Sequence, residues 1–366
     1  MSFDPTHRPD FSAGYPHQLA LLPPRRVIAN TDFGDLLLKA RVELAELKGA
    51  SGQIPNPLLL IAPVIIRESV ASSNIENINT TLADVLQWQL FPEAEQRPPD
   101  KEVLRYREAM NWGFNNYGKY ALSSRLITGI QSRLMPDGNG QYRREQNQIA
   151  NLASRESLYT PPIASDIPAL IGNWENYVNA TDESIDPLLR AAIAHYQFEA
   201  LHPFRDGNGR TGRILMVLQL IQSGLLQFPI LYISGYINQN RSEYYRRLLG
   251  VTAEGNWHEF IEYMLAGFYV KARETHEDLT KITRLFDEVK EQVRSRNKKI
   301  YSADLVEALF TYPVITPTKL ASQLNKHYTT TSRYLAQLTE MGILKEALVG
   351  KYHLFANHKL LQILIK

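Results

Sequence analysis

The segment DPLLRAAIAHYQFEALHPFRDGNGRTGRILMVLQLIQSG, residues 186–224, holds a short polar loop between two strongly apolar stretches. Asp186 followed by Pro187 is a favourable N-cap and first helical residue, so we predict a helix from there to about His202. A second helix is predicted over residues 210–223, and Gly224 ends it. The loop between the two helices carries most of the chemical information in the chain.

The rest of the chain also shows mainly helical spacing. Residues 135–162 are an exception: the DGNG tetrapeptide at 137–140 indicates a turn, and we expect a small β-hairpin flap there. The first 30 residues contain five prolines and are expected to form an extended arm that lies on the rest of the protein. The predicted fold class is therefore mainly α, a helical bundle with one flap. Further helices are expected over residues 32–47 with Asp32 as N-cap, 63–75, 81–89, 102–115 and 167–179, with two or three more in 240–296.

Composition excludes several classes of protein. The chain has 366 residues, 44% hydrophobic and 21% charged, which is ordinary for a globular protein of two or three domains. Its 40 basic and 38 acidic residues give a net charge of +2, so the whole chain makes no case for binding nucleic acid or a membrane. It has no cysteine, which excludes a disulfide framework and a cysteine nucleophile. The N-terminus lacks an apolar segment and the longest apolar run spans only residues 57–66, so we expect a cytoplasmic protein without a membrane segment.

The sequence changes character at residues 294–299 (RSRNKK), which we interpret as a domain boundary. Beyond it, three short apolar helix faces precede an alternating pattern around Val349-Gly350, which is typical of a winged helix-turn-helix domain. Ser332, Arg333 and Gln337 face away from the apolar side. This is compatible with DNA contact, but such domains also serve as protein-docking or dimer modules. We predict three domains, residues 1–110, 111–296 and 297–366.

The loop that begins at His202 combines groups that suit polyphosphate chemistry. Two glycines let its backbone approach an anion closely, and the free amides at the start of the following helix favour negative charge. Arg210 and Arg213 lie three residues apart, so both guanidinium groups can reach one polyphosphate. Asp206 supplies an oxygen ligand suited to Mg²⁺. His202 would face the same anion as a general base.

Three other interpretations of the loop compete with this one. A P-loop needs a Lys-Ser/Thr after its glycines and a strand before them, and the sequence has neither. His195, Glu199 and His202 share a helix face and could hold a metal, although a histidine inside an apolar helix is more often a core residue. A solvated surface turn would explain the glycines but not the flanking histidine and the paired arginines.

The segment HPFRDGNGRTGR at 202–213 resembles the Fic family motif HxFx(D/E)GNGRxxR at every fixed position. The resemblance implies a Fic-type helical fold and an enzyme that transfers AMP from ATP to a protein hydroxyl, with pyrophosphate leaving. It implies that His202 deprotonates the Ser, Thr or Tyr hydroxyl of the target and that Asp206 holds Mg²⁺. It further implies that ATP is bound by the loop residues Arg205, Asp206, Gly207, Asn208, Gly209, Arg210 and Arg213.

A second resemblance lies upstream. Residues 72–77 (SSNIEN) are similar to the (S/T)xxxE(G/N) inhibitory helix of Fic proteins, with Ser72, Glu76 and Asn77 at the fixed positions. In the family that glutamate pairs with the second motif arginine, here Arg213, and blocks productive seating of the γ-phosphate. The resemblance therefore implies autoinhibition by Glu76, within a helix at about residues 63–77.

Two further segments have looser counterparts in the family. Tyr159, Thr160 and Pro161 resemble the end of the flap that docks the backbone of the target, with a rigid surface turn as the alternative. Residues 236–241 (YINQNR) resemble the segment that lines the adenine pocket. There Tyr236 and Asn240 would contact the base, with an aromatic core helix as the alternative.

The resemblance implies particular partners. These are ATP with Mg²⁺ and a protein target, which could be the chain itself. A homodimer and DNA contact through the winged helix are further expectations. Two alternatives stay open: a DNA-binding regulator that uses the loop as a nucleotide sensor, and an enzyme that removes AMP from a modified target at the same site.

Overall fold

The computed structural model describes residues 11–24, 28–52, 57, 61–150, 156–181 and 184–365. Helices dominate these residues, as predicted, and small antiparallel sheets accompany them. The strands are β1 (Ile149–Ala150), β2 (Ser157–Tyr159), β3 (Val314–Ile315), β4 (Lys345–Val349) and β5 (Tyr352–Ala356). The α-helices are α1 (Gly34–Gly52), α3 (Ala62–Ile75), α4 (Leu82–Trp88), α5 (Pro98–Tyr120), α6 (Ser124–Leu134), α7 (Ile167–Val178), α8 (Pro187–Leu201), α9 (Asn208–Gln222), α10 (Ile233–Gln239), α11 (Arg241–Glu254), α12 (Trp257–Arg296), α13 (Ala303–Thr311), α14 (Pro317–Leu324), α15 (Tyr328–Glu340) and α16 (His358–Leu364). Short 3₁₀ turns lie at η1 (Asn30–Phe33), η2 (Glu93–Glu95), η3 (Pro136–Gly138) and η4 (Ala164–Asp166).

The chain divides into two compact units. Helices α1, α5, α10 and α12 contribute residues to both. The domain boundaries near residues 110 and 296 stay a prediction. The first unit contains Met1–Val42, Glu108–Leu225 and Tyr236–Tyr269, and the second contains Glu43–Arg107, Leu226–Gly235 and Val270–Lys366.

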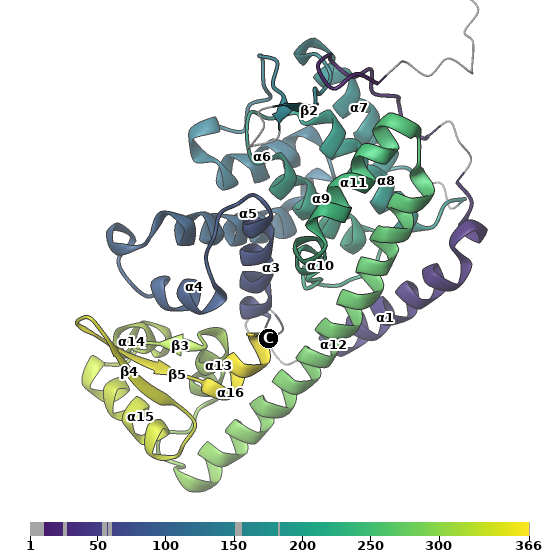
Figure 1. Ribbon diagram of the computed structural model, residues 1–366. Coiled ribbons are helices and arrows are strands. Elements are labelled where there is room, and N and C mark those ends of the chain that lie inside the picture. The colour runs from purple at the N-terminus through teal and green to yellow at the C-terminus, as the bar shows by residue number, and fades with distance from the viewer. Residues whose placement is uncertain are drawn as a thin grey trace, which may run out of the picture. The chain divides into compact units, whose positions relative to one another are not determined.

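In the first unit, α6, α7, α8 and α9 pack against one another (Figure 1). Helix α8 begins as predicted: Asp186 is the N-cap, its carboxylate accepts the N–H of Leu188 at 2.8 Å, and Pro187 is the first residue. Nearly every side chain of α8 is buried, charged and apolar alike, so this helix is the core of the unit. Helix α9 also ends as predicted, just before Gly224 with its φ of 72°.

The N-terminal arm lies on the first unit, as the sequence predicts for its described part; residues 1–10 and 25–27 lie outside the described residues. The N–H of His17 donates to the carbonyl of Thr160 at 2.9 Å. The side chain of Gln197 donates to the carbonyl of Ala20 at 2.7 Å, so the arm contacts both the flap and α8. The flap itself is a hairpin of β1 and β2, also as predicted.

One predicted helix start is wrong. Asp32 is not the N-cap of α1, because that helix begins only at Gly34. Asp32 instead belongs to the 3₁₀ turn η1, where its carboxylate accepts the N–H of Ala29 at 3.1 Å. The carboxylate of Asp32 therefore caps the amide at the start of the 3₁₀ turn, and not the first turn of α1.

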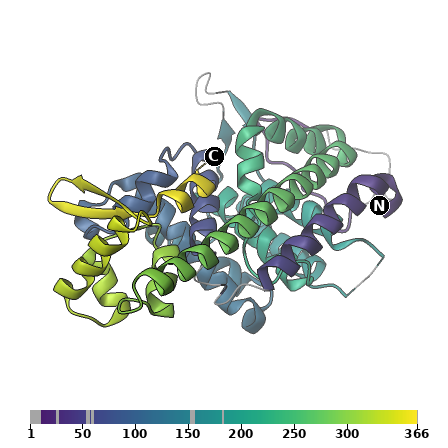
Figure 2. The same cartoon turned by 90° about the horizontal axis from the view of Figure 1, so that it is seen from below.

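In the second unit, the C-terminal residues form α13, α14 and α15, followed by the β4–β5 hairpin that is yellow in Figure 2. Strand β3 completes a three-stranded antiparallel sheet in the order β3-β5-β4. Gly350, with a φ of 57°, forms the turn of the hairpin. This topology is consistent with the predicted winged helix-turn-helix. Among the helices that the structure describes, none has the length and apolar character needed to cross a membrane.

Candidate active site

His202 follows α8 directly, and its backbone lies in the left-handed region with a φ of 48°. This conformation is uncommon for a residue with a side chain, and it turns the chain sharply away from the helix. Nδ1 of His202 lies 3.4 Å from the carbonyl oxygen of Glu199. A proton on Nδ1 would be donated to that carbonyl, which leaves Nε2 with the lone pair that a general base requires.

The loop after His202 is fastened to α9 by one side chain. Asn208 is the first residue of α9, two residues before the predicted start. Its side-chain oxygen accepts the N–H of Phe204 at 2.8 Å, and its nitrogen donates to the carbonyl of Phe204 at 2.9 Å. Both residues are buried. Asn208 therefore fixes the shape of the loop, a task that the motif alone does not reveal.

Gly207 needs to be a glycine for two reasons. Its φ is 77°, and a Cβ placed on it would lie 3.0 Å from Cγ of Met135. The next residue begins α9, so the N-terminal end of that helix, which favours negative charge, directly follows the loop. Asp206 accepts the N–H of Gly207 at 2.6 Å while its side chain stays 69% exposed.

The two motif arginines are buried within the first unit. Arg210 is 2% exposed and Arg213 1% exposed, both on α9. Nη2 of Arg210 lies 3.3 Å from Sδ of Met135 and 4.0 Å from Oδ1 of Asp206. The planar fork of a guanidinium suits recognition of phosphate. Arg205, by contrast, is exposed.

His195 is a core residue next to the arginines. Its Nε2 lies 2.8 Å from the hydroxyl of Tyr244. Burial, together with the nearby charge of Arg213, lowers the pKa of His195 to about 3, so its imidazole is neutral. Across the described parts of the chain, no group of three His, Cys, Asp or Glu could hold a metal ion. The burial of His195 and its contact with Tyr244 favour the core interpretation of this residue.

The predicted adenine residues lie where α10 meets α11. The side chain of Asn240 donates to the carbonyl of Tyr236 at 3.0 Å, and the ring of Tyr236 lies 5.1 Å from that of Tyr263. Tyr263 in turn lies 6.2 Å from the ring of Tyr244, the partner of His195. Burial raises the pKa of both Tyr236 and Tyr263. The sequence does not single out Tyr263, because only its aromatic character marks it.

The flap residues singled out in the sequence are buried rather than exposed. Tyr159, Thr160 and Pro161 all face inward. The hydroxyl of Tyr159 donates to the carbonyl of Ala200 at 2.7 Å, which fixes the flap to the end of α8. Leu158, the residue before Tyr159, is 45% exposed. A role of Tyr159, Thr160 and Pro161 in docking a target stays a prediction.

The predicted inhibitory residues belong to the second unit. Ser72 is fully buried in α3, Glu76 is the C-cap of that helix, and Asn77 follows with a φ of 63°. Asparagine and glycine tolerate this left-handed conformation best, which gives a physical reason for the last position of the pattern. Helix α3 is anchored by a buried ion pair of Arg67 with Asp278 at 2.7 Å. The pairing of Glu76 with Arg213 stays a prediction.

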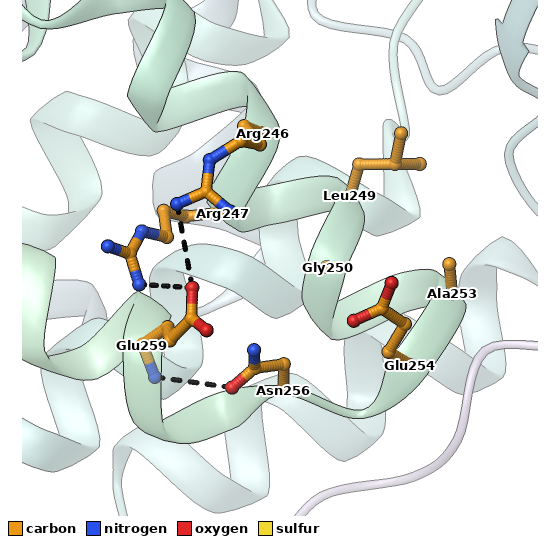
Figure 3. Close-up of a pocket in the computed structure, with 8 residues that line it drawn as sticks. All are labelled: Arg246, Arg247, Leu249, Gly250, Ala253, Glu254, Asn256 and Glu259. Carbon is orange, nitrogen blue, oxygen red and sulfur yellow. Dashed lines mark hydrogen bonds and ion pairs between the residues drawn. The ribbon is translucent and has the colours of Figure 1, made fainter.

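A separate cleft of 220 Å³ lies between α11 and the start of α12, and none of its lining residues belongs to the motif (Figure 3). The two arginines that line it both pair with carboxylates. Arg246 and Arg247 both pair with Glu243, and hydrogen bonds from Arg246 first and then Arg247 lower the pKa of that carboxylate to about 2. Both arginines also pair with Glu259. These arginines are already occupied by carboxylates, so we do not place the phosphates of a nucleotide there.

Family models match three successive parts of the chain. They are described as Fic/DOC family N-terminal at residues 35–115, Fic/DOC family at residues 121–220, and protein adenylyltransferase SoFic-like, C-terminal domain, at residues 285–360. The middle model contains the motif loop and the flap. The first contains the predicted inhibitory helix.

Curated relatives and solved structures agree with these models. The protein adenylyltransferase Fic of Drosophila grimshawi is 29% identical over 202 residues, and that of Drosophila melanogaster is 28% identical over 202 residues. The first alignment covers 53% of this chain, and the chain spans only 39% of that relative. A Fic family protein from Desulfovibrio desulfuricans G20 is 21% identical with a TM-score of 0.58, over 91% of this chain and 98% of that one. A Fic domain containing signaling protein from Bacteroides thetaiotaomicron VPI-5482 is 15% identical with a TM-score of 0.53, over 67% of this chain and 97% of that one. At these identities the two structures show the fold alone.

The helical core and the glycine loop between α8 and α9 define a Fic-type domain. With the matching N-terminal and C-terminal models on either side of it, the chain belongs to the Fic/DOC family. The family resemblance drawn from the motif is thereby confirmed.

Proposed function

We propose that this chain is a protein adenylyltransferase, which transfers AMP from ATP to a hydroxyl side chain of a protein. The observation that carries the proposal is the geometry of the motif loop. His202 is turned out of α8 by its left-handed backbone, and the loop after it leads into the N-terminus of α9, where Arg210 and Arg213 are held. A base and an anion site so close together suit transfer of a nucleotidyl group. The curated relatives bear the name of this activity.

In this proposal the arginines, the first amides of α9 and His202 have separate tasks. Arg210 and Arg213 bind the β- and γ-phosphates, and the first amides of α9 bind phosphate oxygens. Nε2 of His202 accepts the proton of the hydroxyl as its oxygen bonds to the α-phosphorus. The bond from that phosphorus to the bridging oxygen breaks, and pyrophosphate leaves with the electron pair. Most of the catalysis is then positioning and charge neutralisation.

Asp206 is the residue that would hold Mg²⁺. Its exposed carboxylate, fixed by the N–H of Gly207, fits an ion that takes one or two protein carboxylates and completes its shell with water and phosphate oxygens. When bound, Mg²⁺ supplies positive charge to the phosphates. The remaining shell would come from ATP, since a single acidic side chain is present in the loop.

We also propose that Glu76 restrains the enzyme by competing with the γ-phosphate for Arg213. A carboxylate is a strong partner for a guanidinium, so it would prevent the phosphate from seating productively. The match of Ser72, Glu76 and Asn77 to the inhibitory pattern of the family, within the part of the chain that the N-terminal family model covers, supports this role.

The test compares wild type with His202→Ala and Glu76→Gly. Each is incubated with Mg²⁺ and α-labelled ATP, alone and with a cell lysate as a source of targets, and labelled protein is identified by intact mass. We expect a mass gain of one AMP per labelled site, with a higher rate of AMP transfer in Glu76→Gly than in wild type. In His202→Ala the rate should fall about 10²- to 10⁴-fold while ATP binding is retained. Labelling by γ-labelled ATP alone, or an undiminished rate in His202→Ala, would contradict the proposal.

DNA contact, a homodimer, a cytoplasmic location and AMP removal stay predictions. One observation on the β4–β5 hairpin argues against DNA contact. Within the second unit, Tyr352 stacks on Phe91 at 4.4 Å and Lys351 pairs with Glu95 at 3.2 Å. A hairpin whose turn binds an acidic protein segment supports protein contact as its role more than contact with a phosphate backbone.

A further inference from the structure

Arg143 lies in the first unit between the flap and the motif loop, and the proposed chemistry does not use it. Its side chain is 7% exposed. The guanidinium donates to three main-chain carbonyls: from Nε to His202 at 2.9 Å, from Nη2 to Pro162 at 2.5 Å, and from Nη1 to Glu145 at 3.3 Å. One side chain thus binds both the residue proposed as the base and the end of the flap.

Backbone and side-chain groups of residues 143–147 make further hydrogen bonds to carbonyls of the motif loop and of the flap. On the motif side, the N–H of Arg143 donates to the carbonyl of Pro203 at 2.9 Å, and the side chain of Asn147 donates to the carbonyl of Phe204 at 3.3 Å. On the flap side, the side chain of Gln146 donates to the carbonyl of Pro161 at 2.8 Å. Residues 143–147, here called the bridging segment, therefore bind three consecutive carbonyls of the loop and two of the flap.

The choice of arginine has a physical reason. A buried cation loses its hydration, and the loss is tolerated only where hydrogen bonds replace it. The planar guanidinium offers five N–H groups in fixed directions, so it can hold several carbonyls in one arrangement. A lysine at this position would place a single ammonium and could not keep the same three acceptors.

The contact with His202 falls where support is needed. The left-handed φ of 48° at His202 is a conformation that persists only when its surroundings hold it. Nε of Arg143 binds the carbonyl of His202 itself, and the N–H of Arg143 binds the carbonyl of the next residue. The peptide groups whose carbonyls belong to His202 and Pro203 are therefore both fixed. Without these bonds the backbone at His202 could relax and carry Nε2 away from its position.

We propose that Arg143 is a positioning residue for adenylyl transfer, which holds His202 in its left-handed conformation and couples the flap to the motif loop. This inference rests on the proposed function, because it concerns the alignment of His202 with the hydroxyl of a target. Arg143 touches neither reactant in this account, so its effect is on the rate of transfer and not on the affinity for ATP.

The experiment uses the whole chain of 366 residues carrying Glu76→Gly, with Arg143→Lys and Arg143→Gln as test variants. The control is Arg144→Lys, because Arg144 is the adjacent arginine in the sequence and is exposed. Three quantities are measured: the rate of AMP transfer at saturating ATP, the Kd for ATP, and amide hydrogen exchange over residues 156–160. We expect Arg143→Lys to slow transfer on the order of 10- to 100-fold, with the Kd for ATP changed less than about twofold. We also expect faster exchange in the flap, and no change of any kind in the control.

Each other outcome has one meaning. If Arg143→Lys transfers AMP at the rate of the control, or loses ATP binding together with transfer, Arg143 has no positioning role. If the parent with Arg143 intact transfers no AMP, the proposed function fails. Hydrogen exchange then still tests the coupling, since unchanged exchange over residues 156–160 in Arg143→Lys and Arg143→Gln would exclude a link between Arg143 and the flap.

Discussion

The tetrapeptide Asp-Gly-Asn-Gly occurs twice in the first unit, at residues 137–140 and 206–209. In the first copy, Pro136–Gly138 form a 3₁₀ turn, and the left-handed residues are Asn139 with a φ of 49° and Gly140 with a φ of 68°. In the second copy, the left-handed residue is Gly207 with a φ of 77°, and the asparagine already begins α9. Identical residues therefore form two different turns.

The residues after each copy account for the difference. Residues 210–222 form a helix whose side chains are almost all buried, and tertiary packing of this kind provides most of the stability of a helix in a protein. The second asparagine is drawn into this first turn, where its side chain binds Phe204. The first copy is followed by the bridging segment, whose groups bind other parts of the chain, so its asparagine stays in a turn. The lesson is that the tetrapeptide permits a phosphate-type loop but does not specify one.

The two turns are also neighbours. The side chain of Gln131 donates to the carbonyl of Asp206 at 3.3 Å, and a Cβ on Gly138 would lie 3.5 Å from the same nitrogen. Met135 precedes the first turn and contacts Arg210. The first turn thus belongs to the support of the second. Matched substitutions in the two copies therefore compare positions that share surroundings and differ in role.

The aspartates should differ most. Asp206→Ala is expected to lower AMP transfer on the order of 10²- to 10³-fold, because it removes the carboxylate proposed to hold the ion that neutralises the phosphates. Asp137→Ala changes an exposed residue and should leave the rate within about twofold. Initial rates at several Mg²⁺ concentrations, in the Glu76→Gly background, measure both. Similar losses in the two variants would remove Asp206 from the metal site.

The first glycines should differ by a smaller amount. Gly207→Ala places a side chain on left-handed backbone and 3.0 Å from Cγ of Met135, and we expect it to lower the free energy of unfolding by about 2 kcal/mol and to weaken ATP binding. Gly138→Ala meets only an ordinary contact, so its effect on unfolding should stay within about 0.5 kcal/mol. Urea unfolding gives the first quantity and titration with ATP the second. Equal effects would mean that the backbone at 207 adapts freely.

These differences mark the limits of what the sequence predicts. Apolar spacing and the caps at Asp186 and Gly224 were enough to predict helices α8 and α9, because such signals depend on neighbouring residues. The start of α9 at Asn208 could not be predicted, since turn and helix compete for the same asparagine and tertiary packing decides. Tyr263 was missed for a related reason, because an aromatic contact between distant segments leaves no periodic pattern.

Arg143 is the clearest case among the site residues. In the sequence it lies within the predicted flap segment, and no motif assigns it a task. Its partners are main-chain carbonyls of His202, Pro162 and Glu145, and every residue type has such a carbonyl. A side chain that binds backbone therefore has no complementary residue for a motif to reveal. The motif is visible in the sequence, whereas the side chain that supports its backbone is recognised only in the folded structure.

The asparagines should give the smallest difference, and glycine is the substitution that separates them. Asn139→Gly keeps the left-handed conformation at no steric cost, so the free energy of unfolding should change by less than about 0.5 kcal/mol. Asn208→Gly deletes the amide that accepts the N–H of buried Phe204, and leaving that donor without a partner should cost about 1–2 kcal/mol. The carbonyl of Phe204 still accepts a hydrogen bond from the side chain of Asn147, so only the N–H of Phe204 loses its partner and the loss of stability stays small. Urea unfolding of the two variants measures the contrast. If Asn208→Gly were as stable as Asn139→Gly, the loop would be held by α9 and the bridging segment alone. The only role left for Asn208 would then be contact with the phosphates of ATP.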